Sequence, residues 1–277
     1  MNDFGLKVRM AIVGSILFGF YLLGGFVFAA AFGAPLYLVL GVGIVVVPAI
    51  QYKLGRWMAV RSVGAEDMPE SGQYQEIHHM TETLCDRMGL ETKPRLMVAD
   101  MGVPNAFATG RKGAGIVVVS TELIRLLERD ELEGVIAHEL AHINNRDVIT
   151  MVLGQSIGMI VSYAVFFVVR GMGENNIGSF VLAYVASIAA NFLVMLFVMA
   201  ISRYREYVAD ADAREAIGAG DPLARALEKI SRGAEGRESR IDDSVSALCI
   251  LNTDRSLLQQ VLSTHPPTEK RIARLRN

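Results

Sequence analysis

Long charge-free apolar runs alternate with polar stretches along the chain. The first run lies between Arg9 and Lys53, where 43 consecutive positions carry no charged side chain. Two further runs, of 22 and 28 residues, cover residues 148–169 and 175–202. One bilayer crossing takes about 20 apolar residues, so each of the later runs can cross once and the first can cross twice. The pattern therefore predicts four transmembrane helices arranged as two hairpins.

A turn at residues 33–35 divides the first run into expected spans at 10–31 and 36–50. The alternative is a cleaved signal peptide, because basic residues precede the run and the Ala-Ala-Ala sequence at 29–31 resembles a cleavage site. However, the run is long for a signal core and a second apolar segment follows at once. These two features favour uncleaved spans.

Composition agrees with a membrane protein that carries a polar domain. Hydrophobic residues make up 52% of the 277 positions and charged residues only 20%, with a mean hydropathy of +0.34. We expect a mainly α membrane protein in which the polar parts form a small α+β domain. The expected boundaries are two membrane hairpins at 1–52 and 148–202, and two halves of the polar domain at 53–147 and 203–277.

Charge and cysteine usage exclude several functions. A net charge of −2 without a clustered basic face gives no support for nucleic-acid binding. No GxxxxGK[ST] signature occurs, so no nucleotide partner is expected. Cys85 and Cys249 lie far apart and lack metal-ligand spacing, which favours two buried thiols in a reducing compartment over a disulfide.

The basic residues are distributed unequally between the two ends of the expected spans. Arg170 alone would lie on one side of the membrane, whereas the other side would hold Lys7, Arg9, Lys53, Arg56, Arg61, Arg146, Arg203 and Arg205. The positive-inside rule therefore places both termini and the polar domain in the cytoplasm, with the chain in the cell membrane.

The polar domain begins with a predicted amphipathic helix at 71–90. His78 and His79 on this helix point about 100° apart, so we expect a solvated face and no shared metal. Near the other end of the chain, residues 232–240 are predicted to form a surface loop or linker.

Two short strands are predicted at 95–100 and 115–120. The segment between them, Pro-Asn-Ala-Phe-Ala-Thr-Gly at 104–110, is rich in small residues. Such a segment suits an edge strand that receives an extended peptide, and a plain hairpin connection explains it equally well.

The strongest chemical motif is His138-Glu139-Leu140-Ala141-His142, an HExxH pattern. On a helix, residues four apart lie on the same face, so His138 and His142 would converge with Glu139 beside them. Two imidazoles and a carboxylate suit a Zn²⁺ ion that holds a water, with Glu139 taking the water's proton. The alternative is a helix that happens to carry two histidines.

The neighbouring sequence predicts a real helix. Asp130 is the expected N-cap, with Glu133 three residues later as in a capping box. Residues 144–145, both asparagine, form a plausible stop. The apolar stripe expected to face the core is Leu132, Val135, Ile136 and Leu140.

A catalytic zinc site needs a third protein ligand. Two antiparallel spans return the chain to the face that it left, so residues just after 202 should come back beside His142. Glu206 and Asp210 lie there, four residues apart, and this like-charge spacing is unfavourable unless a cation is close. By charge pattern alone, a solvated acidic helix face is the simpler interpretation.

Several motifs together resemble the HtpX-type membrane metalloproteases, which are related to the CAAX prenyl endopeptidases. In chain order, these motifs are PNAFATG at 104–110, HELAH followed by Asp147, SRYREYVADADA from residue 202, and STHPP at 263–267 with Arg271-Ile272. The resemblance covers nearly the whole chain.

This resemblance implies a zincin-like cytoplasmic protease domain with one Zn²⁺ per chain, in which His138, His142 and Glu206 bind the metal and Glu139 is the general base. Asp210 and Asp147 would accept hydrogen bonds from the ligand imidazoles. His265 would stabilise the oxyanion or donate a proton. The substrate would be aligned by Asn105, Ala106, Phe107 and Ala108. The implied role is quality control, the cleavage of damaged or misfolded membrane proteins under stress.

Two other functions remain open. A site-2-type intramembrane metalloprotease would carry HExxH inside an apolar span, but this motif lies in a polar segment. A membrane scaffold with a structural zinc would need a fourth protein ligand, for which His265 or Asp210 is the candidate.

Overall fold

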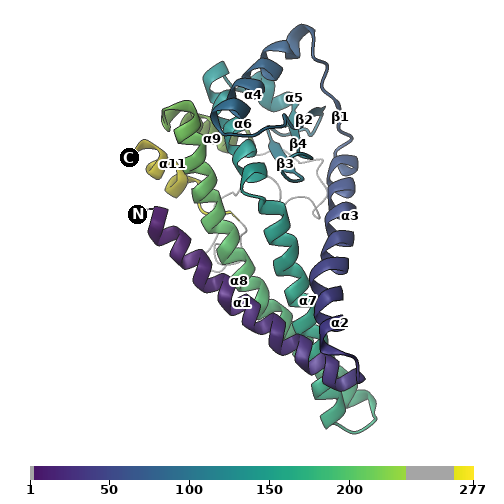
Figure 1. The fold of residues 1–277 in the computed structure, drawn as a ribbon. Coiled ribbons are helices and arrows are strands. Elements are labelled where there is room, and N and C mark those ends of the chain that lie inside the picture. The colour runs from purple at the N-terminus through teal and green to yellow at the C-terminus, as the bar shows by residue number, and fades with distance from the viewer. Residues whose placement is uncertain (1–2, 235–264) are drawn as a thin grey trace. The chain divides into compact units, whose positions relative to one another are not determined.

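The computed structural model describes residues 3–234 and 265–277, and it is mainly helical with one small mixed sheet (Figure 1). The mainly helical character and the small sheet of the expected fold class are confirmed, whereas its four membrane spans are not. The chain divides into two compact units. We call Met1–Lys53 with Ile149–Tyr204 the helical unit, and Leu54–Val148 with Arg205–Asn277 the sheet unit. The loop expected at 232–240 is wrong for residues 232–234, which end a helix at Asp221–Ala234. Cys249 and residues 235–240 lie outside the described residues.

Long helices account for the helical unit. Gly33 has a φ of +61° at the turn where the first hairpin was expected. The helices that contribute to this unit are α1 (Asp3–Phe32), α2 (Leu36–Gly41), a π-helical turn (Val42–Val46), the start of α3 (Val47–Ser62), α7 (Asp147–Met172) and α8 (Ile177–Ile217).

Three helical segments are long and apolar enough to cross a membrane: Met10–Ala30, Asp147–Met172 and Ile177–Ile217. The expected span at 36–50 is not among them, because the π-helical turn divides the helix there and the second part, α3, soon becomes polar. A fourth span therefore stays a prediction.

Small residues let the helices of this unit pack closely. A Cβ on Gly154 of α7 would lie 2.8 Å from Val198 of α8, and one on Gly24 of α1 would lie 3.2 Å from Ile160. Large apolar side chains point outward from the same helices, including Leu23 at 62% exposure and Leu182 at 63%. An outward apolar surface is what a lipid bilayer requires.

The sheet unit contains four strands in the order β1-β2-β4-β3. Strands β2 and β4 are parallel, whereas β1 and β3 pair antiparallel to β2 and β4. A plain hairpin connection does not describe residues 104–110, because residues 106–109 form a strand at the edge of the described sheet. The bounds are β1 (Glu66–Asp67), β2 (Arg95–Ala99), β3 (Ala106–Thr109) and β4 (Ile116–Ser120).

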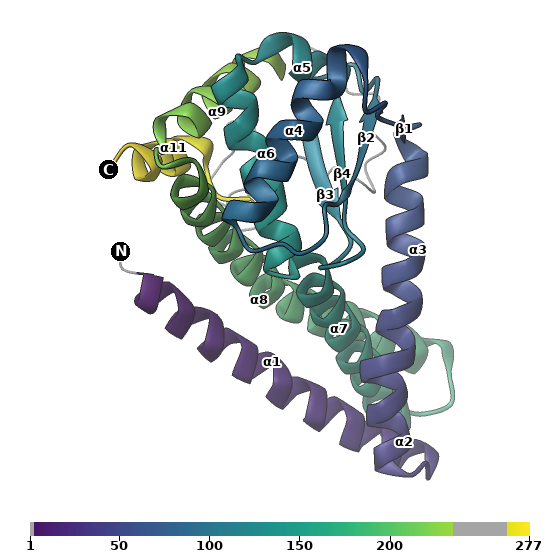
Figure 2. The same ribbon diagram turned by 45° about the horizontal axis from the view of Figure 1, so that its top comes forward.

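Alternating side chains give the sheet two buried faces. Val117 and Val119 of β4 pack with the apolar residues of α4 (Gln75–Arg87) and α6 (Arg129–Asn144), the two helices that cover this face in Figure 2. Ile116 and Val118 point to the opposite face.

The expectation of a solvated histidine pair on α4 is wrong for His78. This side chain is 6% exposed, and its Nε2 lies 3.1 Å from the Met68 carbonyl oxygen. The Met68 carbonyl supplies the partner that a buried imidazole requires.

The helix that carries HELAH, α6, ends at Asn144 as expected but begins earlier than expected. Its N-cap is Glu128, whose N–H donates to the Glu131 carboxylate at 2.9 Å, so the Asp130–Glu133 capping box is wrong. Asp130 instead forms an ion pair with Arg225 of α9 (Asp221–Ala234). The predicted apolar stripe is buried, with Leu132, Val135, Ile136 and Leu140 each at most 6% exposed.

Helix α9 packs closely on α6 at Gly134. A Cβ at this position would lie 3.0 Å from the Leu223 backbone nitrogen. The short helix α11 (Thr268–Arg276) packs in turn on α9, and Leu275 joins the same core. Close packing at Gly134 therefore sets how near α9 can approach the helix that carries HELAH.

We expect Gly134→Ala to destabilise the protein by about 1–3 kcal/mol, because the added methyl group would press against backbone atoms that cannot rotate away. In an open helix the same change is stabilising by about 0.5–1 kcal/mol. Gly55→Ala on α3 is the matched control, since nothing lies within 4 Å of its Cβ position. Thermal unfolding in detergent should separate the two variants, and equal midpoints would contradict the close contact.

Candidate active site

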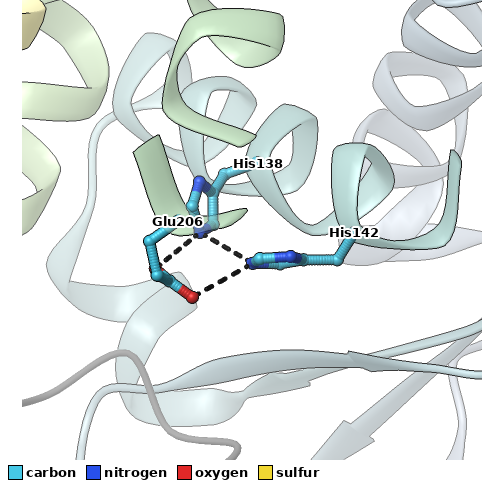
Figure 3. Close-up of side chains that lie close together, drawn as sticks. All are labelled: His138, His142 and Glu206. Carbon is cyan, nitrogen blue, oxygen red and sulfur yellow. Dashed lines mark hydrogen bonds and ion pairs between the residues drawn. The ribbon is translucent and has the colours of Figure 1, made fainter. Parts of the chain in front are cut away.

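Two helices of the sheet unit's fold bring three possible metal ligands together. His138 and His142 lie one turn apart on α6, and Glu206 comes from α8 (Figure 3). The two Nε2 atoms are 3.1 Å apart. Each lies 3.5 Å from one oxygen of the Glu206 carboxylate. One ligand atom from each residue lies within 4.8 Å of the others.

The other ring nitrogen of each histidine meets a carboxylate. Nδ1 of His142 lies 2.6 Å from Asp147 Oδ2, and Nδ1 of His138 lies 3.1 Å from Asp210 Oδ1. An ionised carboxylate can only accept, so Nδ1 carries the hydrogen in both rings. Each Nε2 is consequently directed toward the other ring and toward Glu206.

The geometry of this group fits a metal ion. Two nitrogen lone pairs repel, so Nε2 atoms 3.1 Å apart require a positive charge between them, either a proton or a metal ion. Zinc bonds of about 2.0–2.1 Å in tetrahedral geometry place ligand atoms about 3.4 Å apart, close to the observed 3.1 Å and 3.5 Å. Two imidazoles and one carboxylate are a donor set that suits zinc.

A proton on this histidine pair would compete with a metal ion. Burial and the Arg271 charge lower the pKa of His138, but hydrogen bonds to Asp210 and Glu206 raise it, and the balance lies at about 9. Burial and the neighbouring His138 lower the pKa of His142. The pair therefore carries one shared proton near neutral pH.

Zinc affinity is expected to rise about tenfold per pH unit between about pH 7 and pH 9. The sign follows from the raised pKa of His138, because below about 9 its proton must leave before a metal can bind. Above that pH the proton has already gone and the dependence should flatten. Competition with a chromophoric chelator across this range measures the effect. An affinity that does not change with pH would contradict the shared proton.

The two predicted catalytic side chains lie next to this group. Glu139 follows His138 on α6 and is 3% exposed. His265, which precedes α11, has its Nδ1 3.0 Å from Glu206 Oε1. The structure thus brings both residues to the site from segments 126 positions apart, and their chemical roles stay predictions.

The predicted substrate-aligning residues lie in or next to β3, and their side chains point into the protein. Asn105, Ala106, Phe107 and Ala108 are all at most 7% exposed. The role of this segment toward a substrate therefore stays a prediction.

Two arginines that the sequence did not single out as site residues are buried here. Arg205 is 5% exposed and pairs with Asp147. From the sequence it was expected only as one of the basic residues on the cytoplasmic side of the membrane. Arg271 is 1% exposed and contacts both Asp210 and Glu206. One signal was present, since Arg205 directly precedes Glu206 and Arg271 belongs to the motif that follows His265.

Comparisons with known proteins identify the family of this chain. Residues 71–277 match the model of peptidase family M48. The chain is 54% identical to a protease HtpX homolog of Halobacterium salinarum, over 97% of this chain and all of that relative. It is 37% identical to a protease HtpX homolog of Pyrococcus abyssi, over 79% of this chain and 77% of the relative.

A solved structure shares the fold. The crystal structure of S. mikatae Ste24p matches 99% of this chain with a TM-score of 0.60 at 19% identity. This chain spans 65% of that protein, slightly less than two thirds of its length. The family match and these relatives, together with three described helices that are long and apolar enough to cross a bilayer, define a membrane metalloprotease, a metal-dependent hydrolase that acts on protein substrates. The chain belongs to peptidase family M48, where its relatives are HtpX-type proteases.

Proposed function

We propose that this chain is a zinc-dependent endopeptidase that binds one Zn²⁺ through His138, His142 and Glu206. The observation that carries the proposal is the group of three ligand atoms within 4.8 Å of one another, in which His138 and Glu206 are buried and His142 is partly buried. In this proposal Asp147 and Asp210 hold the two imidazoles by their Nδ1 atoms, as the distances of 2.6 Å and 3.1 Å support.

Glu139 is the proposed general base. The chemistry that zinc supplies when bound is polarisation of the scissile carbonyl and a water with a pKa near 7. Glu139 is buried directly beside a ligand histidine, where its carboxylate can take a proton from that water and deliver it to the leaving nitrogen. Burial of the site also excludes bulk water, which strengthens each of these electrostatic interactions.

His265 is the proposed partner of the carbonyl oxygen as negative charge develops on it. Its position next to Glu206 supports this role, because a ring held there lies at the edge of the metal group. A donor aimed at a developing oxyanion is a large contributor to such reactions.

The edge strand β3 is proposed to align the substrate through its main chain. The Ser120 N–H donates to the Asn105 carbonyl at 2.8 Å, and the Asn105 N–H donates to Ser120 Oγ at 2.9 Å, so Asn105 is occupied by β4. Main-chain groups alternate in direction along an antiparallel strand. Ala106 and Ala108 therefore direct their N–H and C=O groups away from β4, on the side where no described strand pairs with β3 and where an extended peptide could add as a further strand.

The proposed location and substrates rest on charge bias and family. The excess of basic residues at one end of the expected spans supports a cytoplasmic protease domain in the cell membrane. Membership of the HtpX-type proteases supports membrane proteins as substrates, in particular damaged or misfolded ones.

The structure gives little support to the two alternatives. A site-2-type protease would carry HExxH inside a membrane span. Helix α6, which carries the motif here, is not among the three described segments that could span a membrane. A structural zinc needs a fourth protein ligand, but Asp210 is already bound by His138 Nδ1 and by Arg271. His265 remains the competing candidate, and its removal should release the zinc ion if it is a fourth ligand.

The proposal is tested with protein purified in detergent and incubated with an unfolded membrane protein. We expect new termini, identified by mass spectrometry, that disappear with 1,10-phenanthroline and return when zinc is added. Cleavage that continues unchanged in metal-free protein would overturn the proposal.

A further inference from the structure

Both histidines of the metal group are held by the same kind of three-part chain. His142 contacts Asp147, and the other oxygen of that carboxylate contacts the Arg205 guanidinium. His138 contacts Asp210, and this carboxylate is bound by Arg271. The Arg271 contact is bidentate, with Nη2 2.7 Å from Oδ1 and Nε 2.9 Å from Oδ2. Each imidazole is thus followed by a carboxylate and then by a guanidinium, and the Arg271 guanidinium also reaches His138 itself, with Nη2 3.3 Å from Nε2.

The four residues that lie beyond the histidines are all buried. Asp147 and Asp210 are 7% and 4% exposed, and Arg205 and Arg271 are 5% and 1% exposed. A buried charge is costly unless it is paired with an opposite charge. Each arginine supplies that opposite charge to its buried carboxylate. Without the guanidinium, the carboxylate would lack both its counter-charge and the second contact that fixes its plane.

Arginine suits this task because its donors form a rigid planar fork. The fork binds both oxygens of Asp210 at once and so fixes which oxygen faces His138. A carboxylate fixed in this way holds the hydrogen on Nδ1 of the imidazole. The ring then presents Nε2 to the metal in one orientation.

Each arginine also ties its carboxylate to a second part of the site. Arg205 donates to the Asn145 carbonyl oxygen at 3.1 Å, which is at the C-terminus of α6. Arg271 Nη1 lies 3.0 Å from Glu206 Oε2. Arg205 therefore fixes His142 to the end of its own helix, and Arg271 fixes His138 relative to the carboxylate ligand from α8.

We propose that Arg205 and Arg271 are positioning residues that set the metal affinity of the site through Asp147 and Asp210. This inference rests on the proposed function, because it presumes that the three ligands bind zinc. It assigns a role to α11 as well, since this helix supplies Arg271 and so completes the metal site from the far end of the chain.

The test measures the zinc dissociation constant of the full-length, metal-stripped protein in detergent. Arg205→Met and Arg271→Met should each raise this constant about 10–100-fold, the range found for residues that orient metal ligands. The matched controls are exposed basic residues on the same helices, Arg214→Met on α8 and Lys270→Met on α11, which should bind zinc as the wild type does.

Double variants show whether each arginine acts through its carboxylate. Asp147→Asn should weaken zinc binding by itself, and adding Arg205→Met should weaken it little further. The pair Asp210→Asn and Arg271→Met should lose more affinity than Asp210→Asn alone, because Arg271 also contacts Glu206, but less than the product of the two single effects. Effects that multiply in the double variants would overturn the proposal, because the arginine would then act independently of the carboxylate.

Two further measurements separate positioning from folding. Circular dichroism and thermal unfolding of the metal-free proteins report whether each variant folds. If a methionine variant does not fold, Arg205→Lys and Arg271→Lys serve instead, because they keep the charge and lose the fork. The lysine variants should fold, bind zinc more weakly, and alter the visible spectrum of bound Co²⁺.

The outcomes distinguish this inference from the proposed function. Wild-type protein that fails to bind zinc would overturn the proposed function. Wild-type protein that binds zinc, together with folded arginine variants of unchanged affinity and unchanged Co²⁺ spectrum, would overturn only the positioning role.

Discussion

Glu139→Gln is expected to reduce peptide-bond cleavage by about 10²–10⁴-fold while zinc stays bound. The amide has nearly the same shape as the carboxylate but cannot accept a proton, and Glu139 contributes no ligand atom to the group of His138, His142 and Glu206. The measurement is the initial rate of cleavage of an unfolded membrane protein, together with bound zinc counted by mass spectrometry.

The control for this experiment lies on the same helix. Glu133→Gln should leave the rate close to that of the wild type, because Glu133 makes a partly exposed ion pair with Arg87 at 3.3 Å. A Glu139→Gln protein that cleaves at an undiminished rate would remove Glu139 from the mechanism. Loss of zinc from this variant would instead indicate that Glu139 helps to hold the metal.

Glu206→Ala is expected to abolish stoichiometric zinc binding and, with it, cleavage. Removing one of three protein ligands should weaken zinc binding by more than the roughly 10–100-fold expected for residues that only orient a ligand. The change also leaves Arg271 and His265 without the carboxylate that they contact. Equilibrium dialysis with zinc measures the loss, and Glu215→Ala, an exposed position on the same helix, is the control.

The same measurement on His265→Ala decides between a catalytic and a structural zinc. A catalytic site with three protein ligands should keep its zinc and lose turnover when His265 is removed. A structural site closed by His265 should lose zinc in both variants. If Glu206→Ala retained one tightly bound zinc ion per chain, the proposed ligand set would be wrong.

The helix around HELAH was predictable because its signals are local. The apolar stripe, the stop at Asn144 and the shared face of His138 and His142 all follow from the 3.6-residue period. Even there, the first turn was misplaced by two residues. Asp130 is a good N-cap by type, but in the fold it pairs with Arg225, 95 positions further along the chain.

The approach of Glu206 to the histidines was predictable from topology. Its charge pattern alone favoured a solvated helix face. The return of the chain after two apolar runs suggested otherwise, and the resemblance to the HtpX-type proteases shifted the balance toward a metal ligand. The edge position of β3 had an equally likely alternative, because the small residues of the segment suit a turn as well as a strand.

The buried arginines show what sequence patterns miss. Arg271 contacts Asp210 from 61 positions away, and Arg205 contacts the Asn145 carbonyl from 60 positions away. No local period distinguishes such a side chain from a solvated one. His78 was misjudged for a similar reason, since its partner is a carbonyl outside its own helix.

The most direct test of this account is a titration of metal-free protein with zinc in which cleavage and bound zinc are measured in the same samples. The account predicts that cleavage rises in proportion to bound zinc and reaches its maximum at one ion per chain. Glu139→Gln should bind the same single ion without cleaving. Full cleavage before zinc is added would contradict the account. So would a Glu206→Ala protein that reaches full cleavage when zinc is added.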